Sequence, residues 1–107
     1  MLLDKKCFPC SSVTPPLTPE QVKECVYQVD AAWQVLEGIK IRRKFLFADF
    51  KSAIAFVNKV AEIAEAEGHH PDIKIHYNKV IIELSTHAVS GLTENDFIVA
   101  AKVDKLH

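Results

Sequence analysis

The sequence IKIHYNKVIIELST at residues 73–86 decides the fold of this chain. Apolar and polar residues alternate along it with the period of two that is typical of a half-buried strand. Two alternating runs, 73–77 and 80–86, are separated by Asn78-Lys79. We therefore expect an antiparallel hairpin that turns at Asn78-Lys79 and brings residue 73 close to residues 84–86. The Tyr77 ring is expected on the apolar face, in the core.

A second hairpin is expected upstream, because residues 33–36 and 39–47 resemble strands and Glu37-Gly38 between them favours a turn. The one apolar face of the second run carries Ile39, Ile41, Phe45 and Phe47. A long helix is predicted between the two hairpins. It begins after the N-cap residue Asp49, runs to about Glu67 and ends at Gly68. Its predicted apolar stripe comprises Phe50, Ala53, Ile54, Val57, Val60, Ala61 and Ala64.

Two further helices flank the hairpins. Thr18 is a good N-cap residue, Pro19 suits the first helical position and Gln21 completes a capping box, so a helix is predicted from there to about Asp30. The last helix begins at Thr93, with Asp96 in a similar box. Its predicted core residues are Phe97, Ala100, Ala101 and Val103.

The order helix, two strands, helix, two strands, helix predicts an α+β domain, in which helices pack on one face of a four-stranded antiparallel sheet. Residues 18–107 form this domain, and the proline-containing residues 1–17 form an irregular N-terminal arm. A sheet this small has exposed edge strands, which proteins often cover by pairing between subunits. We therefore expect a homo-oligomer, a homodimer at least.

Length and composition exclude several classes of function. One domain of 107 residues with 49% apolar residues is typical of a globular protein. A formal net charge of −1 gives no electrostatic basis for direct binding of nucleic acid or of a membrane surface. We read neither a signal peptide nor an apolar run of membrane-spanning length, so the chain is expected in the cytoplasm.

The three cysteines do not form a recognisable framework. Cys7 and Cys10 make a CxxC pair, whereas a structural zinc site normally needs two such pairs, and Cys25 adds at most a third ligand. No strand precedes the pair, as it would in a thioredoxin-like motif. Tail cysteines without a function are the favoured interpretation, and a site shared between subunits stays open.

Histidines are the unusual feature, because four of the five lie between positions 69 and 87: His69, His70, His76 and His87. The ordinary pKa of imidazole, about 6.5, suits acid–base chemistry at neutral pH. Pro71 favours an extended backbone at His70, which points the side chains of His69 and His70 to opposite sides of a loop. The hairpin brings His87 near His70. A metal site is disfavoured, since His76 is expected to face solvent and no HExxH spacing occurs.

These residues carry a resemblance to a family. Glu65, His69-His70-Pro71, Tyr77, His87 and Asp96, at these spacings, resemble the signature of the pterin-4a-carbinolamine dehydratases, also called 4a-hydroxytetrahydrobiopterin dehydratases. Residues 45–50 and 77–80, Ser85-Thr86-His87 and Gly91-Leu92-Thr93 are similar as well, and the resemblance spans residues 18–106. It implies the same order of elements and a homodimer or a homotetramer. It also implies dehydration of a 4a-hydroxytetrahydropterin to the quinonoid dihydropterin, without a metal or an organic cofactor.

The resemblance also implies roles for residues. His70 is the expected principal catalytic residue, and His69 and His87 are the other acid–base or hydroxyl-contacting groups. Glu65 orients a histidine or contacts the pterin, and Pro71 orients His70. Ser85 and Thr86 resemble the pterin-binding edge. Asp96 either bonds a histidine or serves only as a helix cap.

The alternative to an enzyme is a protein-binding module. Some relatives act as dimerisation cofactors for a homeodomain transcription factor, and an exposed helix face or sheet edge would suit such a partner. The basic run Arg42-Arg43-Lys44 is expected to be a solvated strand face.

Overall fold

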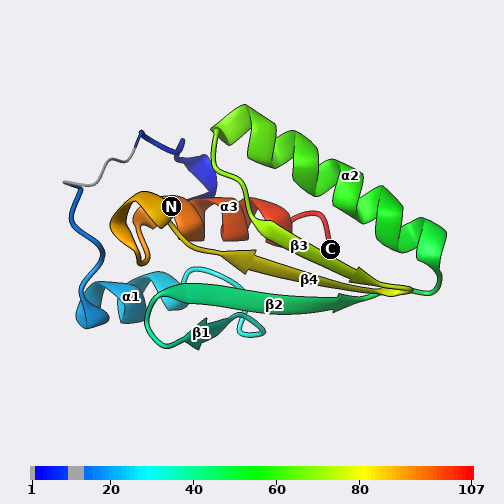
Figure 1. The fold of residues 1–107 in the computed structure, drawn as a ribbon, viewed down its shortest axis with the longest axis horizontal. Coiled ribbons are helices and arrows are strands. Elements are labelled where there is room, and N and C mark those ends of the chain that lie inside the picture. The colour runs from blue at the N-terminus through cyan, green and yellow to red at the C-terminus, as the bar shows by residue number, and fades with distance from the viewer. Residues whose placement is uncertain (1, 10–13) are drawn as a thin grey trace.

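The computed structural model describes residues 2–9 and 14–107. Its described part contains three α-helices and four strands, in the order α1, β1, β2, α2, β3, β4, α3 (Figure 1). The helices are α1 (Pro19–Val26), α2 (Phe50–Glu67) and α3 (Glu94–Asp104). The strands are β1 (Gln34–Leu36), β2 (Lys40–Leu46), β3 (Asp72–His76) and β4 (Lys79–Leu84). The predicted α+β architecture is confirmed.

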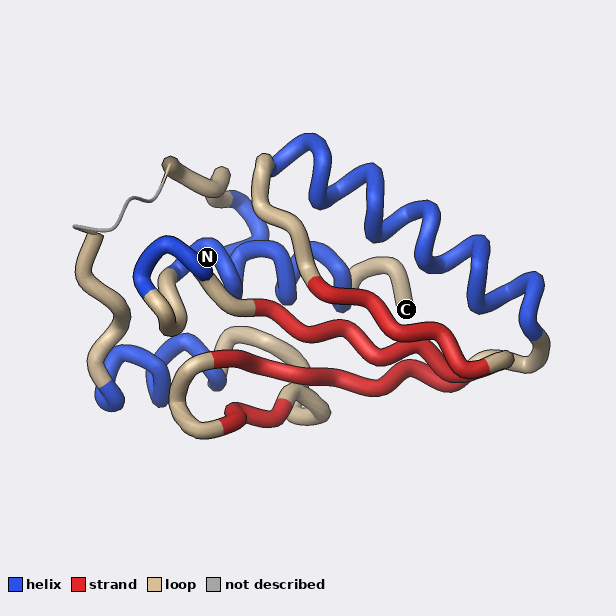
Figure 2. The backbone as a smooth tube through the Cα atoms, in the orientation of Figure 1, coloured by secondary structure: helices blue, strands red, loops and turns tan. Residues whose placement is uncertain are grey.

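The sheet is antiparallel throughout, with the strand order β1-β2-β4-β3 (Figure 2). Its centre is therefore the pairing of β2 with β4, from Ile41 opposite Leu84 to Leu46 opposite Lys79. The helices lie against one face of the sheet, and α2 contacts both β4 and α3. None of the helices in the described residues combines the length and the apolar character needed to cross a bilayer.

The second hairpin turns one residue earlier than predicted. The turn lies at Tyr77-Asn78, so Ile73 pairs with Ile82 and not with residue 84. Asn78 fixes this position, because its side-chain Nδ2 donates to the carbonyl of Phe47 over 3.0 Å while its carbonyl accepts from the Phe47 N–H over 2.9 Å. Tyr77 takes a left-handed φ of 54° in the turn and is 67% exposed, so its predicted place in the core is wrong.

The other differences are local. The first helix ends at Val26 and not near Asp30. Instead, the backbone N–H of Asp30 donates to the side chain of Asp104, and the side chain of Asp30 accepts from the N–H of Ala32. Ile39 lies outside β2 and is exposed. In α2, Phe50 is exposed and Ala61 faces solvent, whereas the unpredicted Phe56 is buried beside Ala53, Val60 and Ala64.

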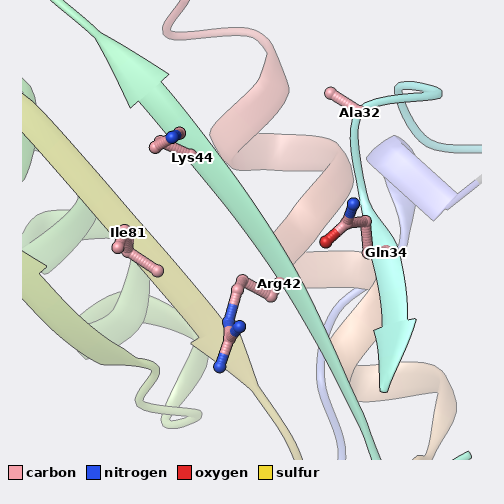
Figure 3. Close-up of a pocket in the computed structure, with 5 residues that line it drawn as sticks. All are labelled: Ala32, Gln34, Arg42, Lys44 and Ile81. Carbon is pink, nitrogen blue, oxygen red and sulfur yellow. The ribbon is translucent and has the colours of Figure 1, made fainter.

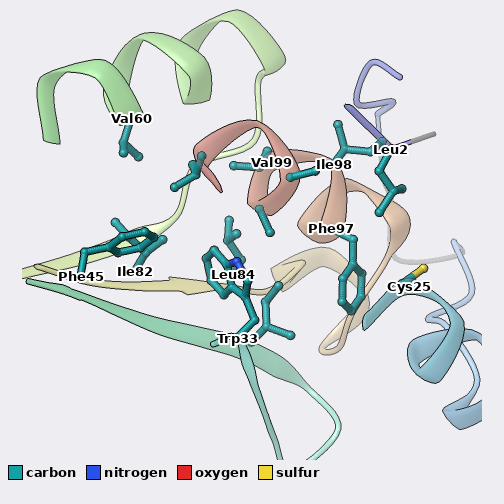
Figure 4. Packing of buried hydrophobic residues seen from close by; sticks show 14 of the residues in the cluster. Leu2, Cys25, Trp33, Phe45, Val60, Ile82, Leu84, Phe97, Ile98 and Val99 are labelled. Atoms are coloured by element: carbon teal, nitrogen blue, oxygen red, sulfur yellow. The ribbon is translucent and has the colours of Figure 1, made fainter. Parts of the chain in front are cut away.

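The core lies between the sheet and the two longer helices (Figure 4). Phe45 from β2 is 1% exposed and contacts the rings of Trp33, Phe56 and His107, at centroid distances of 6.3, 4.7 and 5.2 Å. The predicted core residues of α3 are all buried, and Ile98 and Val99 are buried as well. The last helix is therefore enclosed on several sides.

Described residues of the N-terminal arm pack against this domain. Leu2–Asp4 forms a 3-10 turn, which the sequence analysis did not anticipate, and Leu2 is buried in the core. Further along, the Cys7 N–H donates to Glu67 Oε1 over 2.8 Å. The other oxygen of Glu67 accepts from Lys102 Nζ over 2.7 Å. Glu67 thus ties the arm and α3 to the last turn of α2.

Replacement of Phe45 by alanine is expected to lower the free energy of unfolding by about 3–5 kcal/mol, because it removes a buried ring and leaves a cavity. The free energy is measured by urea denaturation. Phe50→Ala is the matched control, since this ring is 50% exposed and its loss should cost far less. Equal losses in the two variants would contradict the assignment of Phe45 to the core.

Glu67 is expected to make the stability of the fold depend on pH in the acid range. The hydrogen bond from Lys102, followed by that from the Cys7 N–H, holds the pKa of the Glu67 carboxyl below its ordinary value of 4.5. A lowered folded-state pKa stabilises the fold above the unfolded-state value, and this contribution is lost as the pH falls through the folded-state value. Wild type should therefore exceed Glu67→Gln in stability at pH 7, and the gap should narrow below about pH 4.5.

Urea denaturation at pH 7, 5 and 4 measures this gap. Glu62→Gln, at an exposed position on the same helix, is the control and should follow the wild-type curve. A gap that stays constant across this range would contradict the role given to Glu67.

Candidate active site

A cleft of about 280 Å³ lies where β3 begins and β4 ends. It brings together five of the residues singled out from the sequence: His69, His70, His87, Ser85 and Thr86. The rest of its lining consists of Phe8, Pro9, Gly68, Ala88 and Asn95. Three imidazoles from two separate segments of the chain therefore share one small polar cleft.

Local structure explains why the histidines meet. Gly68 ends α2 with a left-handed φ of 66°, a conformation that costs glycine little, and the chain then turns toward β3. In the observed register Asp72 lies opposite Glu83, so continuing two residues upstream brings the His70 position level with Ser85. His87 follows shortly, at the start of the short 3-10 helix η2 (His87–Val89). The half-buried Pro71 lies between the histidine pair and β3.

A buried carboxylate underlies the cleft. Asp96 has no exposed surface, and its Oδ1 lies 2.6 Å from His69 Nε2. Its Oδ2 accepts from the Thr86 hydroxyl and from the Thr93 N–H, each over 2.9 Å. The two threonine hydroxyls are 2.8 Å apart. Asp96 therefore both bonds a histidine and caps α3, which unites the two roles left open by the sequence.

This network fixes the chemistry of His69. An ionised carboxylate only accepts hydrogen bonds, so we assign the proton between His69 and Asp96 to His69 Nε2. In the neutral ring the lone pair then resides on Nδ1. The carboxylate itself lies in the first turn of α3, where the helix macrodipole favours negative charge.

His70 has a different environment. Its Nε2 lies 3.2 Å from Glu65 Oε1, and both side chains are well exposed, at 60% and 79%. Glu65 is on the last turns of α2, outside the lining of the cleft. Each histidine of the pair thus has its own carboxylate, one buried and one in solvent.

Besides Gly68 and Ala88, the sequence analysis missed three lining residues: Phe8, Pro9 and Asn95. Phe8 and Pro9 belong to the arm, whose prolines and lack of periodicity indicated only an irregular segment. Asn95 reads as an ordinary residue of the first turn of α3. No pattern in the sequence connects these residues, which are more than 80 positions apart and meet only through the tertiary structure.

The two described cysteines, Cys7 and Cys25, do not line the cleft. Burial, then the nearby charge of Glu67, raises the pKa of the Cys7 thiol to about 12, so it keeps its proton at neutral pH. Cys7 and Cys25 are free thiols, and Cys10 lies outside the described residues. Across residues 2–9 and 14–107, no three His, Cys, Asp or Glu side chains gather in a metal-binding group.

A second hollow, of about 360 Å³, lies on the sheet face away from the helices (Figure 3). Its lining residues are Ala32, Gln34, Arg42, Lys44 and Ile81. This hollow contains no imidazole, thiol or carboxylate, so it offers charge and hydrogen bonds but no acid–base pair. Of the two sites, only the cleft has the groups for proton transfer.

The fold and the cleft together describe a small α+β protein with three histidines in one polar cleft, and the comparisons identify its family. The chain belongs to the pterin-4-alpha-carbinolamine dehydratase family, whose model matches residues 15–106. It is 45% identical over 104 residues to a protein of Alkaliphilus metalliredigens that is provisionally named as this dehydratase, covering 97% of this chain and 94% of that protein. A protein of Nitrosospira multiformis with the same provisional name is 48% identical, with coverages of 98% and 91%.

Two solved structures from this comparison have a similar fold. A protein of Brucella melitensis, described as a transcriptional coactivator/pterin dehydratase, superimposes with a TM-score of 0.79 at 36% identity, covering 85% of this chain and 97% of that one. A pterin dehydratase-like protein, described as a RuBisCO assembly factor in the alpha-carboxysome, matches with a TM-score of 0.61 at 27% identity, covering 70% and 88%.

Asp96→Asn tests the buried network. The amide oxygen can still accept from Thr93, but the amide nitrogen then faces His69 Nε2 and forces the imidazole proton onto Nδ1. We expect a folded protein that is about 1–3 kcal/mol less stable, with the opposite His69 tautomer, measured by urea denaturation and by ¹⁵N NMR of the imidazole. Glu94→Gln, in the same helical turn, should leave the tautomer unchanged. An unaltered tautomer in Asp96→Asn would overturn the proton assignment.

Proposed function

We propose that this protein dehydrates 4a-hydroxytetrahydropterin to the quinonoid dihydropterin by histidine acid–base catalysis. The observation that carries the proposal is the convergence of His69, His70 and His87 in one cleft beside Ser85 and Thr86. Membership of the dehydratase family supports the substrate class.

The reaction suits these groups because it is only a transfer of protons around one bond cleavage. The C–O bond at position 4a breaks, and the hydroxyl leaves as water once an acid has protonated it. The adjacent ring nitrogen gives its proton to a base as the C=N bond forms. Nothing is oxidised or reduced, so the reaction calls for no redox cofactor. Positioned acid–base groups typically accelerate such steps by ~10²–10⁴-fold.

The two carboxylates suggest a division of roles. His69 holds its Nε2 proton against Asp96 and keeps a lone pair on Nδ1, which suits the base that accepts the ring proton. His70 is the principal catalytic residue and the acid, because its Nε2 lies 3.2 Å from the Glu65 carboxylate and its exposure allows reprotonation from water. His87 contacts the departing hydroxyl. Ser85 contacts the polar edge of the pterin, whereas Thr86 acts through its bonds to Asp96 and Thr93.

In the cell this reaction would return an oxidised product of a tetrahydrobiopterin-type cofactor toward its reduced form, in the cytoplasm. The active form in this proposal is a homodimer or a homotetramer. The strand order supports assembly, because β1 and β3 are the edges of the sheet and edge strands are commonly paired between subunits.

A second candidate function is binding of a regulatory protein partner. The observation that favours it is the uncovered sheet face, where Lys40, Arg42 and Lys74 surround Glu83 and the hollow of Figure 3 opens beside Lys44. The Brucella protein is described as a coactivator as well as a dehydratase. A partner bound there would be retained by His70→Ala and released by Lys44→Glu, as measured by co-purification.

Dehydration of freshly generated 4a-hydroxytetrahydropterin tests the enzymatic proposal. Wild type should exceed the spontaneous rate, and His70→Ala should lose about 10²-fold or more of that acceleration. A chelator should change neither rate. The matched control is His76→Ala, since this histidine is exposed on β3 and does not line the cleft.

Two results would contradict the proposal. If the folded wild type does not accelerate the reaction, 4a-hydroxytetrahydropterin is excluded as its substrate. Loss of activity with chelator would replace imidazole acid–base catalysis by a metal-dependent reaction.

A further inference from the structure

The walls of the cleft differ in chemistry according to their origin. The folded domain contributes imidazoles, hydroxyls and the amide of Asn95, together with the small residues Gly68 and Ala88. Among the residues that line the cleft, the large apolar side chains are Phe8 and Pro9, and both come from the N-terminal arm. The family model begins at residue 15, so this wall lies outside the segment that it matches.

The arm is held in place by a specific clamp. The Phe8 N–H donates to Asn95 Oδ1 over 3.0 Å, and Asn95 Nδ2 donates to the Phe8 carbonyl over 2.7 Å. Asn95 is 3% exposed, and one residue earlier the Cys7 N–H donates to Glu67. The Asn95 side-chain amide thus pairs with both the N–H and the carbonyl of Phe8, as a neighbouring strand does in a β-ladder. This pair of hydrogen bonds fixes the backbone of Phe8. Phe8 is therefore positioned against the α3 turn that also holds Asp96.

A flat heteroaromatic ligand needs two kinds of contact. Polar groups fix its edge, and an apolar or aromatic surface covers its face, which is the usual composition of a small-molecule site. The histidines and Ser85 can serve the edge. Phe8 lines the cleft and is 43% exposed. Aromatic pairs gain binding energy beyond the area that they bury.

We propose that Phe8, clamped by Asn95, is the aromatic contact for the ring face of the substrate and sets the affinity of the cleft for it. This inference rests on the proposed function for the identity of the ligand as a pterin. Phe8 is a binding residue that takes no part in proton transfer, and Asn95 is a positioning residue that acts through it. Loss of either should weaken substrate binding and leave the chemical step intact.

Kinetics with 4a-hydroxytetrahydropterin separate these effects. Phe8→Ala should raise KM about tenfold and leave kcat within about twofold, and Phe8→Trp should restore most of the affinity. Asn95→Ala should shift KM in the same direction, because the arm loses its clamp. Lys5→Ala is the control within the arm. Its side chain pairs with Glu94 away from the cleft, so KM should not change. Thermal denaturation of each variant verifies that it is folded.

Equilibrium binding of a fluorescent oxidised pterin gives a measurement that does not depend on turnover. Fluorescence anisotropy should show a dissociation constant about tenfold higher for Phe8→Ala than for wild type. An unchanged KM and dissociation constant in Phe8→Ala, in a protein that His70→Ala inactivates, would overturn this inference and leave the proposed function standing. A fall in kcat with KM unchanged would overturn it as well. A wild type that neither binds the pterin nor dehydrates the substrate would overturn both.

Discussion

The buried carboxylate of Asp96 is the interaction on which the site depends. One oxygen holds His69, and the other joins Thr86, just past the end of β4, to Thr93 at the start of α3. A carboxylate without exposed surface is costly unless its hydrogen bonds are made, and here both oxygens are engaged. The same four groups thus close the connection from sheet to helix and orient an imidazole. A substitution of Asp96 is therefore expected to lower the stability of the fold and also to change the orientation of the His69 ring.

The two histidine–carboxylate pairs place identical side chains in different environments. His69 and His70 are adjacent in sequence, yet one is enclosed and fixed in orientation while the other is open to solvent. The enclosed imidazole is held against a buried carboxylate, whereas both members of the other pair are open to solvent. The separation follows from their partners, since His69 contacts the buried Asp96 of α3 and His70 contacts the exposed Glu65 of α2.

Much of the fold could be predicted from the sequence, because its hydrophobic periods and caps are clear. The capping box at Thr18, the cap at Asp49 and the stop at Gly68 all lie where the local pattern indicated. The errors arose where tertiary contacts decide. Asn78 donates to Phe47, and the hairpin turn lies one residue earlier than predicted. Asp104 accepts from the N–H of Asp30, which lies beyond the end of the first helix. For the site, the histidine spacing indicated the cleft, but the wall formed by the arm has no local signal, since Asn95 and Phe8 meet only in three dimensions.

The strand order has a kinetic consequence. The central ladder joins β2 to β4, with residues as distant as Ile41 and Leu84 opposite each other, and the whole of α2 lies between them in sequence. Each hairpin can form alone within microseconds, but neither completes the sheet. The entropy of closing this long loop must be lost before the central contacts are gained, and that slows folding relative to a helical bundle of similar size. We therefore expect the rate-limiting step of folding to be the docking of two preformed hairpins across α2.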